Sequence, residues 1–244
     1  MKYACFDLEI ATELPEGRLW GNKDPLGISC AALSFSDKDE VKVWSGVPQM
    51  YALDNIQMLQ DLKEYSKEYK IVTWNGCGFD FQVLAQETGL YAECGEIAMN
   101  HIDLMLNVTF LKGYRLGLDA VLSGAGLAGK KHEVMLKNGY VLHNMSGALA
   151  PDLWSKGETD AVIEYLKDDV RQPLLLVEDI NLTHGIQWIS KSGKSQRVFI
   201  DRLKTVRELF NIPHPDVSWM TNPPKRSDFV EWIPDWESYV NNVK

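Results

Sequence analysis

Residues 2–10 read KYACFDLEI, a largely apolar run that two acids, Asp7 and Glu9, interrupt. Side chains alternate between the two faces of a β-strand, so residues i and i+2 point to the same face. We therefore expect a strand that is buried on both faces and carries both acids on one of them. Burying one charge is costly, and two on the same face cost more unless a cation lies between them. The alternative is an edge strand whose polar face meets solvent.

Two later segments carry acids that match this pair. The first is NGCGFD, residues 75–80, and the second is YLKDD, residues 165–169. On a helix, the four-residue spacing of Tyr165 and Asp169 places their side chains one above the other. Taken singly, Asp80 also suits a helix N-cap, Asn75 a turn and Asp169 an exposed helix face. Taken together, four carboxylates that meet must bind cations or repel one another, which predicts a metal site suited to phosphodiester cleavage.

The composition is that of an ordinary globular protein, with 244 residues of which 45% are hydrophobic and 24% charged. No apolar run approaches the roughly 20 residues that a membrane helix needs, and the N-terminus lacks a basic segment followed by an apolar one. The four cysteines are scattered without a CxxC pair, which favours buried, reduced thiols. These features predict a cytoplasmic chain with no membrane partner.

The charge is unevenly distributed along the chain. The formal net charge is −9, yet residues 184–226 contain eight bases and three acids and are therefore +5, which leaves −14 for the remainder. A metal site also neutralises part of the acidic excess. We therefore expect salt-sensitive nucleic-acid binding that is modest in strength.

The hydrophobic periodicity predicts the element order β-β-β-α-β-α-α-α. Strands are expected at residues 2–10, 28–35, 41–44 and 71–74, with a polar turn at 36–39. Helices are expected over residues 53–69, 79–86, 116–122 and 158–179. Three antiparallel strands followed by helices and a parallel strand indicate an α/β fold, a mixed RNase H-like sheet flanked by helices.

The character of the sequence changes after residue 182. Residues 186–200 are expected to form a hairpin with a basic tip, followed by a short helix over 203–210 and a tail rich in proline and tryptophan. No linker separates the two parts. We expect a catalytic domain over residues 1–182 and a C-terminal extension over residues 183–244.

The three acidic segments resemble the three exo motifs of the DEDD superfamily of 3′–5′ exonucleases. Asp7 and Glu9 match the first motif, Asn75, Phe79 and Asp80 the second, and Tyr165 and Asp169 the third. Tyrosine in the third motif is similar to the DEDDy branch, which includes the proofreading domains of family-B DNA polymerases. The resemblance covers about residues 2–180 and departs from the family pattern at Ile10, where threonine or serine is common.

The resemblance implies two divalent cations, Mg²⁺ or Mn²⁺, about 3.5–4 Å apart. Asp7, Glu9 and Asp169 would hold the cation on the side of the attacking water, and Asp7 and Asp80 the other. Tyr165 would orient the water. Asp168 is an alternative ligand to Asp169, but the tyrosine spacing favours Asp169.

The activity implied is hydrolysis of single-stranded DNA from its 3′ end, releasing mononucleotides. A 3′–5′ exoribonuclease on the same fold and a non-catalytic nucleic-acid-binding module are the alternatives. A polymerase in trans is the expected partner, in proofreading or end-trimming during DNA replication, with a phage-like replication module as the setting.

Further residues are candidates for substrate contact. Asn75 and Phe79 lie in the second motif, and Lys191, Lys194 and Arg197 surround flexible serines in the predicted hairpin, where a solvated tip is the alternative. Asp103 suits an accessory carboxylate or a helix cap equally. Three tryptophans suit base stacking or buried packing, namely Trp188, Trp219 and Trp232.

Overall fold

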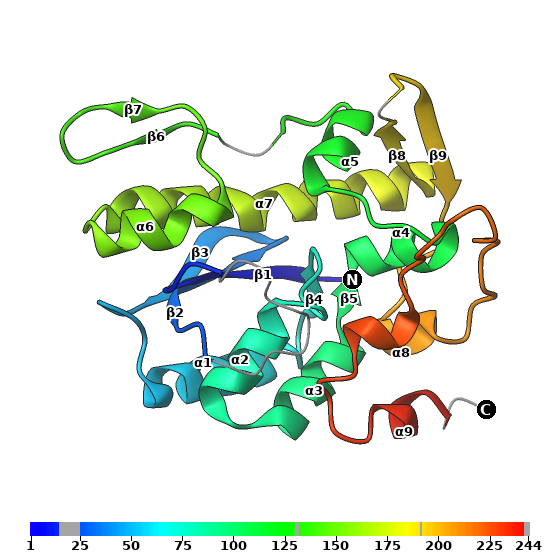
Figure 1. Ribbon diagram of the computed structural model, residues 1–244, viewed down its shortest axis with the longest axis horizontal. Helices are drawn as coiled ribbons and strands as arrows, with labels where there is room; N and C mark the ends of the chain where they lie inside the picture. The colour runs from blue at the N-terminus through cyan, green and yellow to red at the C-terminus, as the bar shows by residue number, and fades with distance from the viewer. Residues whose placement is uncertain (15–24, 130–131, 191, 242–244) are drawn as a thin grey trace.

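The sheet at the centre of the molecule has five strands in the order β3-β2-β1-β4-β5 (Figure 1). The computed structural model describes residues 1–14, 25–129, 132–190 and 192–241. The strands are β1 (Tyr3–Ile10), β2 (Ile28–Phe35), β3 (Lys38–Ser45), β4 (Lys70–Thr73) and β5 (Ile102–Asp103). β3, β2 and β1 pair antiparallel, whereas β1, β4 and β5 pair parallel. The predicted mixed α/β sheet is confirmed.

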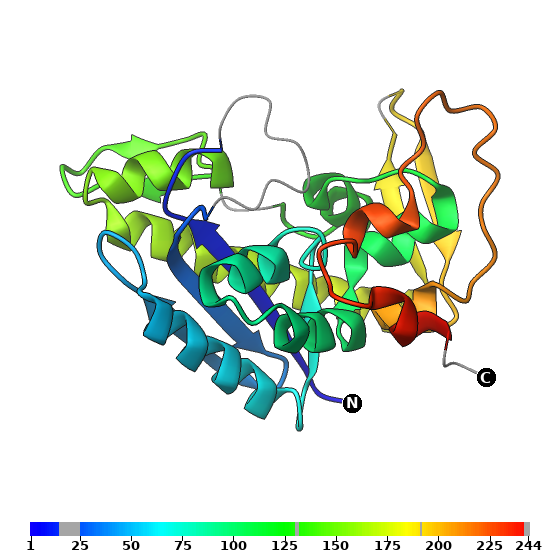
Figure 2. The same ribbon diagram turned by 60° about the horizontal axis from the view of Figure 1, so that its bottom comes forward.

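Helices cover both faces of this sheet (Figures 1 and 2). One face carries α1 (Ala52–Tyr65), α2 (Asp80–Thr88) and α3 (Tyr91–Asn100), and the other carries the long helix α7 (Thr159–Thr183). Along β1, Phe6 and Leu8 pack into the core with α1–α3, while Cys5 packs into the core with α7. Because side chains alternate along the strand, Asp7 and Glu9 share the face of Cys5 and point toward α7.

Several predicted boundaries shift in the structure. β3 begins at Lys38, so the turn that precedes it is shorter than the predicted 36–39. α1 ends at Tyr65 rather than near residue 69, because residues 66–68 form a turn before β4.

Between α2 and α5, three elements were not predicted, namely α3, β5 and α4 (Leu104–Lys112). Residues 104–110 of α4 are all buried. A helix that is buried on every side has no one-sided apolar stripe, so periodicity does not reveal it.

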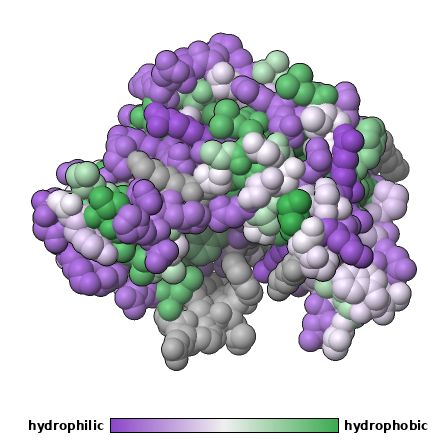
Figure 3. Space-filling view, turned by 90° about the horizontal axis from the view of Figure 1, so that it is seen from above, coloured by the Kyte–Doolittle hydropathy of each residue, from purple (hydrophilic) through white to green (hydrophobic). Residues whose placement is uncertain are grey.

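A group of short elements lies on the α7 side of the sheet (Figure 1). It comprises α5 (Leu118–Gly124), the hairpin of β6 (Val134–Met135) and β7 (Val141–Leu142), the 3₁₀ turn η1 (Gly147–Leu149) and α6 (Ala150–Ser155). α5 confirms the predicted helix over residues 116–122. Seen from above, this side of the molecule intermingles polar and apolar residues (Figure 3).

The C-terminal part of the chain begins with the predicted hairpin, now seen as β8 (Gly185–Ile189) paired with β9 (Ser195–Phe199). The helix that follows, α8 (Val206–Leu209), is shorter than the predicted 203–210, and η2 (Arg226–Phe229) and α9 (Trp236–Asn241) complete the chain. This part contributes five side chains to the core that contains α1–α3, namely Val206, Leu209, Phe229, Val230 and Ile233. Among the described residues, no helix has the length and apolar character needed to cross a lipid bilayer.

Candidate active site

Strand β1 delivers the first two acids. Asp7 is half-buried and Glu9 is buried, 6% exposed, on the face that looks toward α7. The pairing of β1 with β2 shifts register between Glu9 and Ile10, and the Ser29 hydroxyl donates to the Glu9 carbonyl at 3.0 Å. Such irregularities re-aim side chains at the ends of strands. Here the irregularity lies directly beside the two acids.

Helix α7 delivers the third acid and the tyrosine. Tyr165 and Asp169 are both buried and lie one turn apart on the same side of the helix. Carboxylate oxygens of Asp7, Glu9 and Asp169 all lie within 4.8 Å of one another. Asp168 is half-buried and accepts a hydrogen bond from Gln172 at 3.3 Å, outside this cluster. The geometry therefore favours Asp169 over Asp168 as the member of the site.

Asp80 supplies the fourth acid from the first position of α2. Its Oδ1 accepts a hydrogen bond from the Leu8 amide of β1 at 3.0 Å, and its side chain is 3% exposed. Burial first, and then the charge of Asp7 beside it, hold the pKa of Asp80 well above its usual range. Asp80 thus adjoins the cluster through Asp7, which is itself one of the acids that face α7.

The pKa values of two neighbouring thiols are also affected by these acids. Burial raises the pKa of Cys5 well above its usual range, and the charges of Asp7, Asp80 and Asp169 raise it further. The pKa of Cys30 is likewise raised by burial and by Glu9 and Asp7. Acids from β1, α2 and α7 therefore act on one small region.

The donor set fits a hard divalent cation. All four side chains are carboxylates, and oxygen ligands of this kind suit Mg²⁺ and Mn²⁺. Three of the four are buried, and buried like charges are costly without a cation between them. The raised pKa of Asp80 records that cost. Asp7, Glu9, Asp80 and Asp169 are therefore the residues that would hold the metal.

A cleft of about 370 Å³ opens beside Glu9. Its lining is mostly apolar apart from two carboxylates, and comprises Glu9, Ile10, Glu13, Leu14, Phe79, Gly147, Ala148 and Pro151. A β-carbon on Gly147 would lie 3.5 Å from Glu9 Oε2, so the backbone of η1 passes directly over this carboxylate. No local signal in the sequence connects η1 with β1, and this wall of the cleft was not predicted.

Asp103 turns out to be both a helix cap and a support of the second motif. Its carboxylate accepts hydrogen bonds from the amides of Asn75, Cys77 and Leu106, each at 3.1 Å, and it N-caps α4. Asn75 has φ 69°, a left-handed conformation that asparagine tolerates better than most residues. Asp103 therefore fixes the loop that leads to Phe79 and Asp80.

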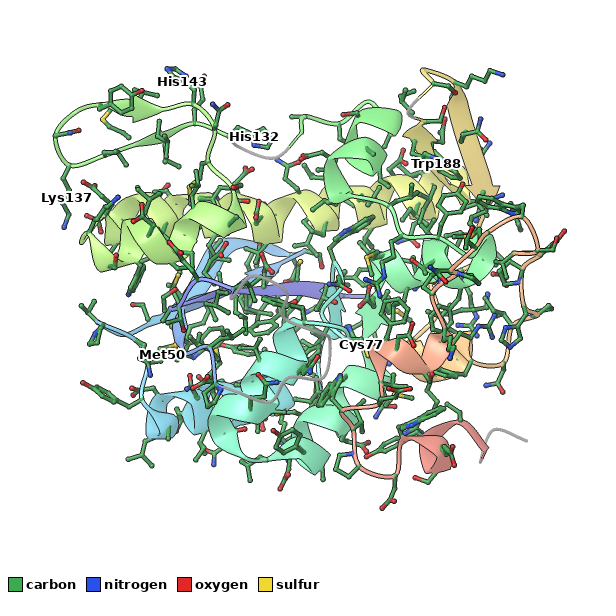
Figure 4. All side chains as sticks on the ribbon, in the orientation of Figure 1. Met50, Cys77, His132, Lys137, His143 and Trp188 are labelled. Carbon is green, nitrogen blue, oxygen red and sulfur yellow. The ribbon has the colours of Figure 1, made fainter. Side chains whose placement is uncertain are left out.

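The basic candidates lie away from this cleft. Lys194 and Arg197 belong to the β8–β9 hairpin at the C-terminal end of α7, and the Arg197 guanidinium donates to the Thr183 carbonyl. The 14 residues from Asp169 to Thr183 span about 21 Å of helix. Figure 4 shows Trp188 of β8 and Lys137 of the β6–β7 hairpin at opposite ends of α7. Lys191 lies outside the described residues.

The three tryptophans have different surroundings. Trp188 is buried, 3% exposed, against α5, whereas Trp219 is 67% exposed and its indole donates to the Asp216 carbonyl. Trp232 is half-buried, and its indole donates to the Cys77 carbonyl at 2.8 Å. Buried packing therefore accounts for Trp188.

A model of a protein family described as the RNase H superfamily matches residues 30–181. The chain belongs to the RNase H superfamily. The matched range contains Asp80, Tyr165 and Asp169, while Asp7 and Glu9 of β1 precede it. No curated protein matches the chain.

Among solved structures, the fold is similar to the family B DNA polymerase from the hyperthermophilic archaeon Pyrobaculum calidifontis. The TM-score is 0.52 at 17% sequence identity, over 74% of this chain and 24% of the polymerase chain. The chain therefore spans about a quarter of the length of that polymerase, and the likeness is one of fold. Superfamily and fold together support a nuclease in the general sense.

Proposed function

We propose that this chain is a divalent-metal-dependent 3′–5′ exonuclease that releases mononucleotides from single-stranded DNA. The observation that supports the proposal is the convergence of Asp7, Glu9 and Asp169, whose carboxylate oxygens lie within 4.8 Å of one another. Asp80 adjoins them through Asp7. Acids from three elements far apart in sequence share one region beside a cleft, as phosphodiester hydrolysis requires.

The four carboxylates would hold and orient the metal. Asp7, Glu9 and Asp169 would share one cation, and Asp7 and Asp80 the second. Bound there, the cations would lower the pKa of the attacking water and neutralise charge on the phosphate. A bound cation would favour the ionised form of Asp80, whose pKa is raised by burial and by the charge of Asp7.

Tyr165 would position the attacking water. It lies one turn before Asp169 on the buried side of α7, so its ring is held by the surrounding core. A fixed hydroxyl beside the metal ligands can direct a water molecule without taking its proton. Tyrosine at this position is what supports assignment to the DEDDy branch.

The terminal nucleotide would occupy the cleft. Phe79 lines it together with Gly147 and Ala148, and an aromatic ring beside the metal ligands suits stacking on a base. Asn75 would act through the loop that presents Phe79. Lys194 and Arg197 lie beyond the cleft, at the C-terminal end of α7, where they would contact only a more distant stretch of the strand.

The cellular setting we propose is DNA replication. The likeness to a family B DNA polymerase supports it, and the polymerase would be a separate chain or a further part of a longer one. Within the present chain, residues 1–182 would be the catalytic domain and residues 183–244 an extension that packs against it.

Labelled oligonucleotides test the proposal. Matched DNA and RNA strands carrying a 5′ label are incubated with the protein and Mn²⁺ or Mg²⁺, and Asp169→Asn serves as the inactive control. A ladder that shortens from the 3′ end of DNA supports the proposal. A ladder from RNA alone shows an exoribonuclease, and no metal-dependent product from either strand shows a binding module. Internal fragments, or equal activity of Asp169→Asn, contradict an exonuclease at this site.

A further inference from the structure

We infer that Trp232, in the C-terminal part of the chain, is a positioning residue for the loop 75–79 that presents Phe79 and Asp80. The inference rests on the proposed function, because it concerns how that site is held in shape. Trp232 lies 51 residues beyond the range that the family model matches, which ends at residue 181. It therefore adds to the site a support from outside the matched part of the fold.

The contact is made on the backbone of Cys77. The indole Nε1 of Trp232 donates to the Cys77 carbonyl at 2.8 Å and is shared with the Phe229 carbonyl at 3.2 Å. The Cys77 thiol in turn donates to the Phe229 carbonyl at 3.5 Å. Trp232 and Phe229 thus each form a hydrogen bond with Cys77 of the loop. Figure 4 shows Cys77 at this junction, beside the C-terminal segment.

The same peptide is held from its other side. The Cys77 amide donates to Asp103 at 3.1 Å, so both the N–H and the C=O of this residue have a fixed partner. One partner belongs to the start of α4 and the other to the segment after η2. The loop lies between two supports from different parts of the chain, and Asp80 follows three residues after Cys77.

Close packing reinforces the hydrogen bonds. A β-carbon on Gly78 would lie 3.2 Å from Phe229 Cδ1, and one on Gly95 of α3 would lie 2.4 Å from Ile233 Cγ2. Because these glycines have no side chains, Phe229 can pack closely against the loop and Ile233 against α3. The Arg115 guanidinium stacks over the Phe229 ring, 4.6 Å from its centroid, and covers it from outside.

Residues 226–233 are themselves tied to the rest of the fold. Arg226 donates to four backbone carbonyls, those of Phe110, Phe210, Ile212 and Pro213, at 2.8–3.4 Å. This guanidinium, one of the eight bases counted in residues 184–226, therefore serves structure. A segment fixed in this way can transmit rigidity to the loop, since displacing Cys77 would disturb contacts at both ends.

Movement of the loop 75–79 would disturb both the cleft and the metal ligands. Phe79 lines the cleft with Glu9, and Asp80 adjoins Asp7, so a loop that moves would move both groups together. Displacements of about 1 Å at a catalytic group can cost about a hundredfold in rate. Trp232 touches neither the acids nor the cleft and acts through the loop alone.

The test compares two variants that each lose one indole N–H. Trp232→Phe keeps an aromatic ring but removes the bond to Cys77. Trp44→Phe is the matched control, because the Trp44 indole of β3 also donates one hydrogen bond, to Asp61 of α1 at 3.0 Å. Three quantities are measured for both and for the parent protein: amide hydrogen exchange of residues 75–80, affinity for Mn²⁺ by calorimetry, and kcat and KM on a single-stranded DNA oligonucleotide.

We expect Trp232→Phe to exchange residues 75–80 at least about tenfold faster than the parent. Its kcat should fall about tenfold or more, its affinity for Mn²⁺ should weaken, and its KM should rise, because Phe79 moves with the loop. Trp44→Phe should match the parent in exchange of residues 75–80, in Mn²⁺ affinity, and in kcat and KM.

Equal exchange and equal kcat in the two variants overturn the inference. A loss confined to thermal stability, with kcat unchanged, also overturns it, since that is what a purely structural role would give. If the parent cuts neither DNA nor RNA, the proposed function fails. Exchange and Mn²⁺ affinity then still decide whether Trp232 holds the loop, because neither readout needs turnover.

Discussion

Asp7, Glu9, Asp80 and Asp169 bring four carboxyl groups into one mostly buried region. In the metal-free protein this arrangement works against folding, because like charges repel and burial disfavours ionisation. The raised pKa of Asp80 is the visible consequence, with burial as the first cause and Asp7 as the second. Residues selected only for stability would not gather in this way.

Asp7→Asn should therefore separate stability from activity. It removes one charge from the cluster while keeping the shape of the side chain. In EDTA we expect its melting temperature to exceed that of the parent by a few degrees, about 1 kcal/mol at this chain length. Nuclease activity should fall at least about a thousandfold. Thermal unfolding in EDTA and a rate assay measure both, and a variant that melts below the parent in EDTA contradicts the account.

Tyr165→Phe should weaken turnover and spare the metal. It removes only the hydroxyl from a ring that the α7 core holds in place. We expect kcat to fall about 10–100-fold, with Mn²⁺ affinity unchanged within about twofold. Tyr140→Phe, at an exposed tyrosine near the β6–β7 hairpin, is the control and should retain parental kcat. Parental kcat in Tyr165→Phe would remove the tyrosine from the mechanism.

His101 gives the fold a specific dependence on pH. Its ring is fully buried beside Thr73 and Asp103, and burial lowers its pKa from 6.5 to about 4. Between those values the unfolded chain binds a proton that the folded chain does not, so this contribution is complete above pH 6.5 and is lost as the pH falls toward 4.

Comparison with His101→Gln isolates this effect. The stability difference between the parent and the variant should shrink by roughly 2–3 kcal/mol from about pH 7 to about pH 4.5. The titration of Asp103, whose pKa burial raises to about 6, runs in the opposite direction but occurs in both proteins. Urea unfolding at a series of pH values measures the difference, and a constant difference would mean that His101 titrates normally.

At the scale of elements, α5 and β8 approach each other at a glycine. A β-carbon on Gly124, the last residue of α5, would lie 2.3 Å from Trp188 Cα and 2.4 Å from the Gln187 carbonyl oxygen. Gly124→Ala should therefore cost about 1–3 kcal/mol through overpacking. Gly117→Ala, where no heavy atom lies within 4 Å, should cost less than about 1 kcal/mol. Denaturant midpoints compare the two, and equal midpoints would contradict the close approach.

Elements that carry a local signal in their own residues could be predicted from the sequence, and elements without one could not. Residues 28–35 were expected as a strand and form β2 with those bounds, because a β-rich run between turn residues is a local signal. α4 was missed because burial surrounds it, whereas α3 has an exposed side and was missed for another reason. The hairpin β6–β7 has only two residues in each strand, too few for alternation to show.

At the scale of the whole molecule, the acids could be predicted and their surroundings could not. Asp7, Glu9, Asp80 and Asp169 stand in motifs whose internal spacing fixes which face each acid occupies. Gly147 approaches Glu9, which lies 138 positions earlier in the chain, and Trp232 bonds to Cys77, which lies 155 positions earlier. Nothing in the sequence of either segment indicates which distant segment it contacts. Lys194 and Arg197 were candidates for substrate contact because they are basic, but they lie in the β8–β9 hairpin, away from the cleft.

The most direct test of the central claim is a crystal structure of the protein grown with Mn²⁺ and examined by anomalous diffraction. We predict two manganese peaks in contact with Asp7, one also bound by Glu9 and Asp169 and the other on the side of Asp80. Peaks elsewhere on the molecule, or none beside these carboxylates at saturating Mn²⁺, would contradict the account.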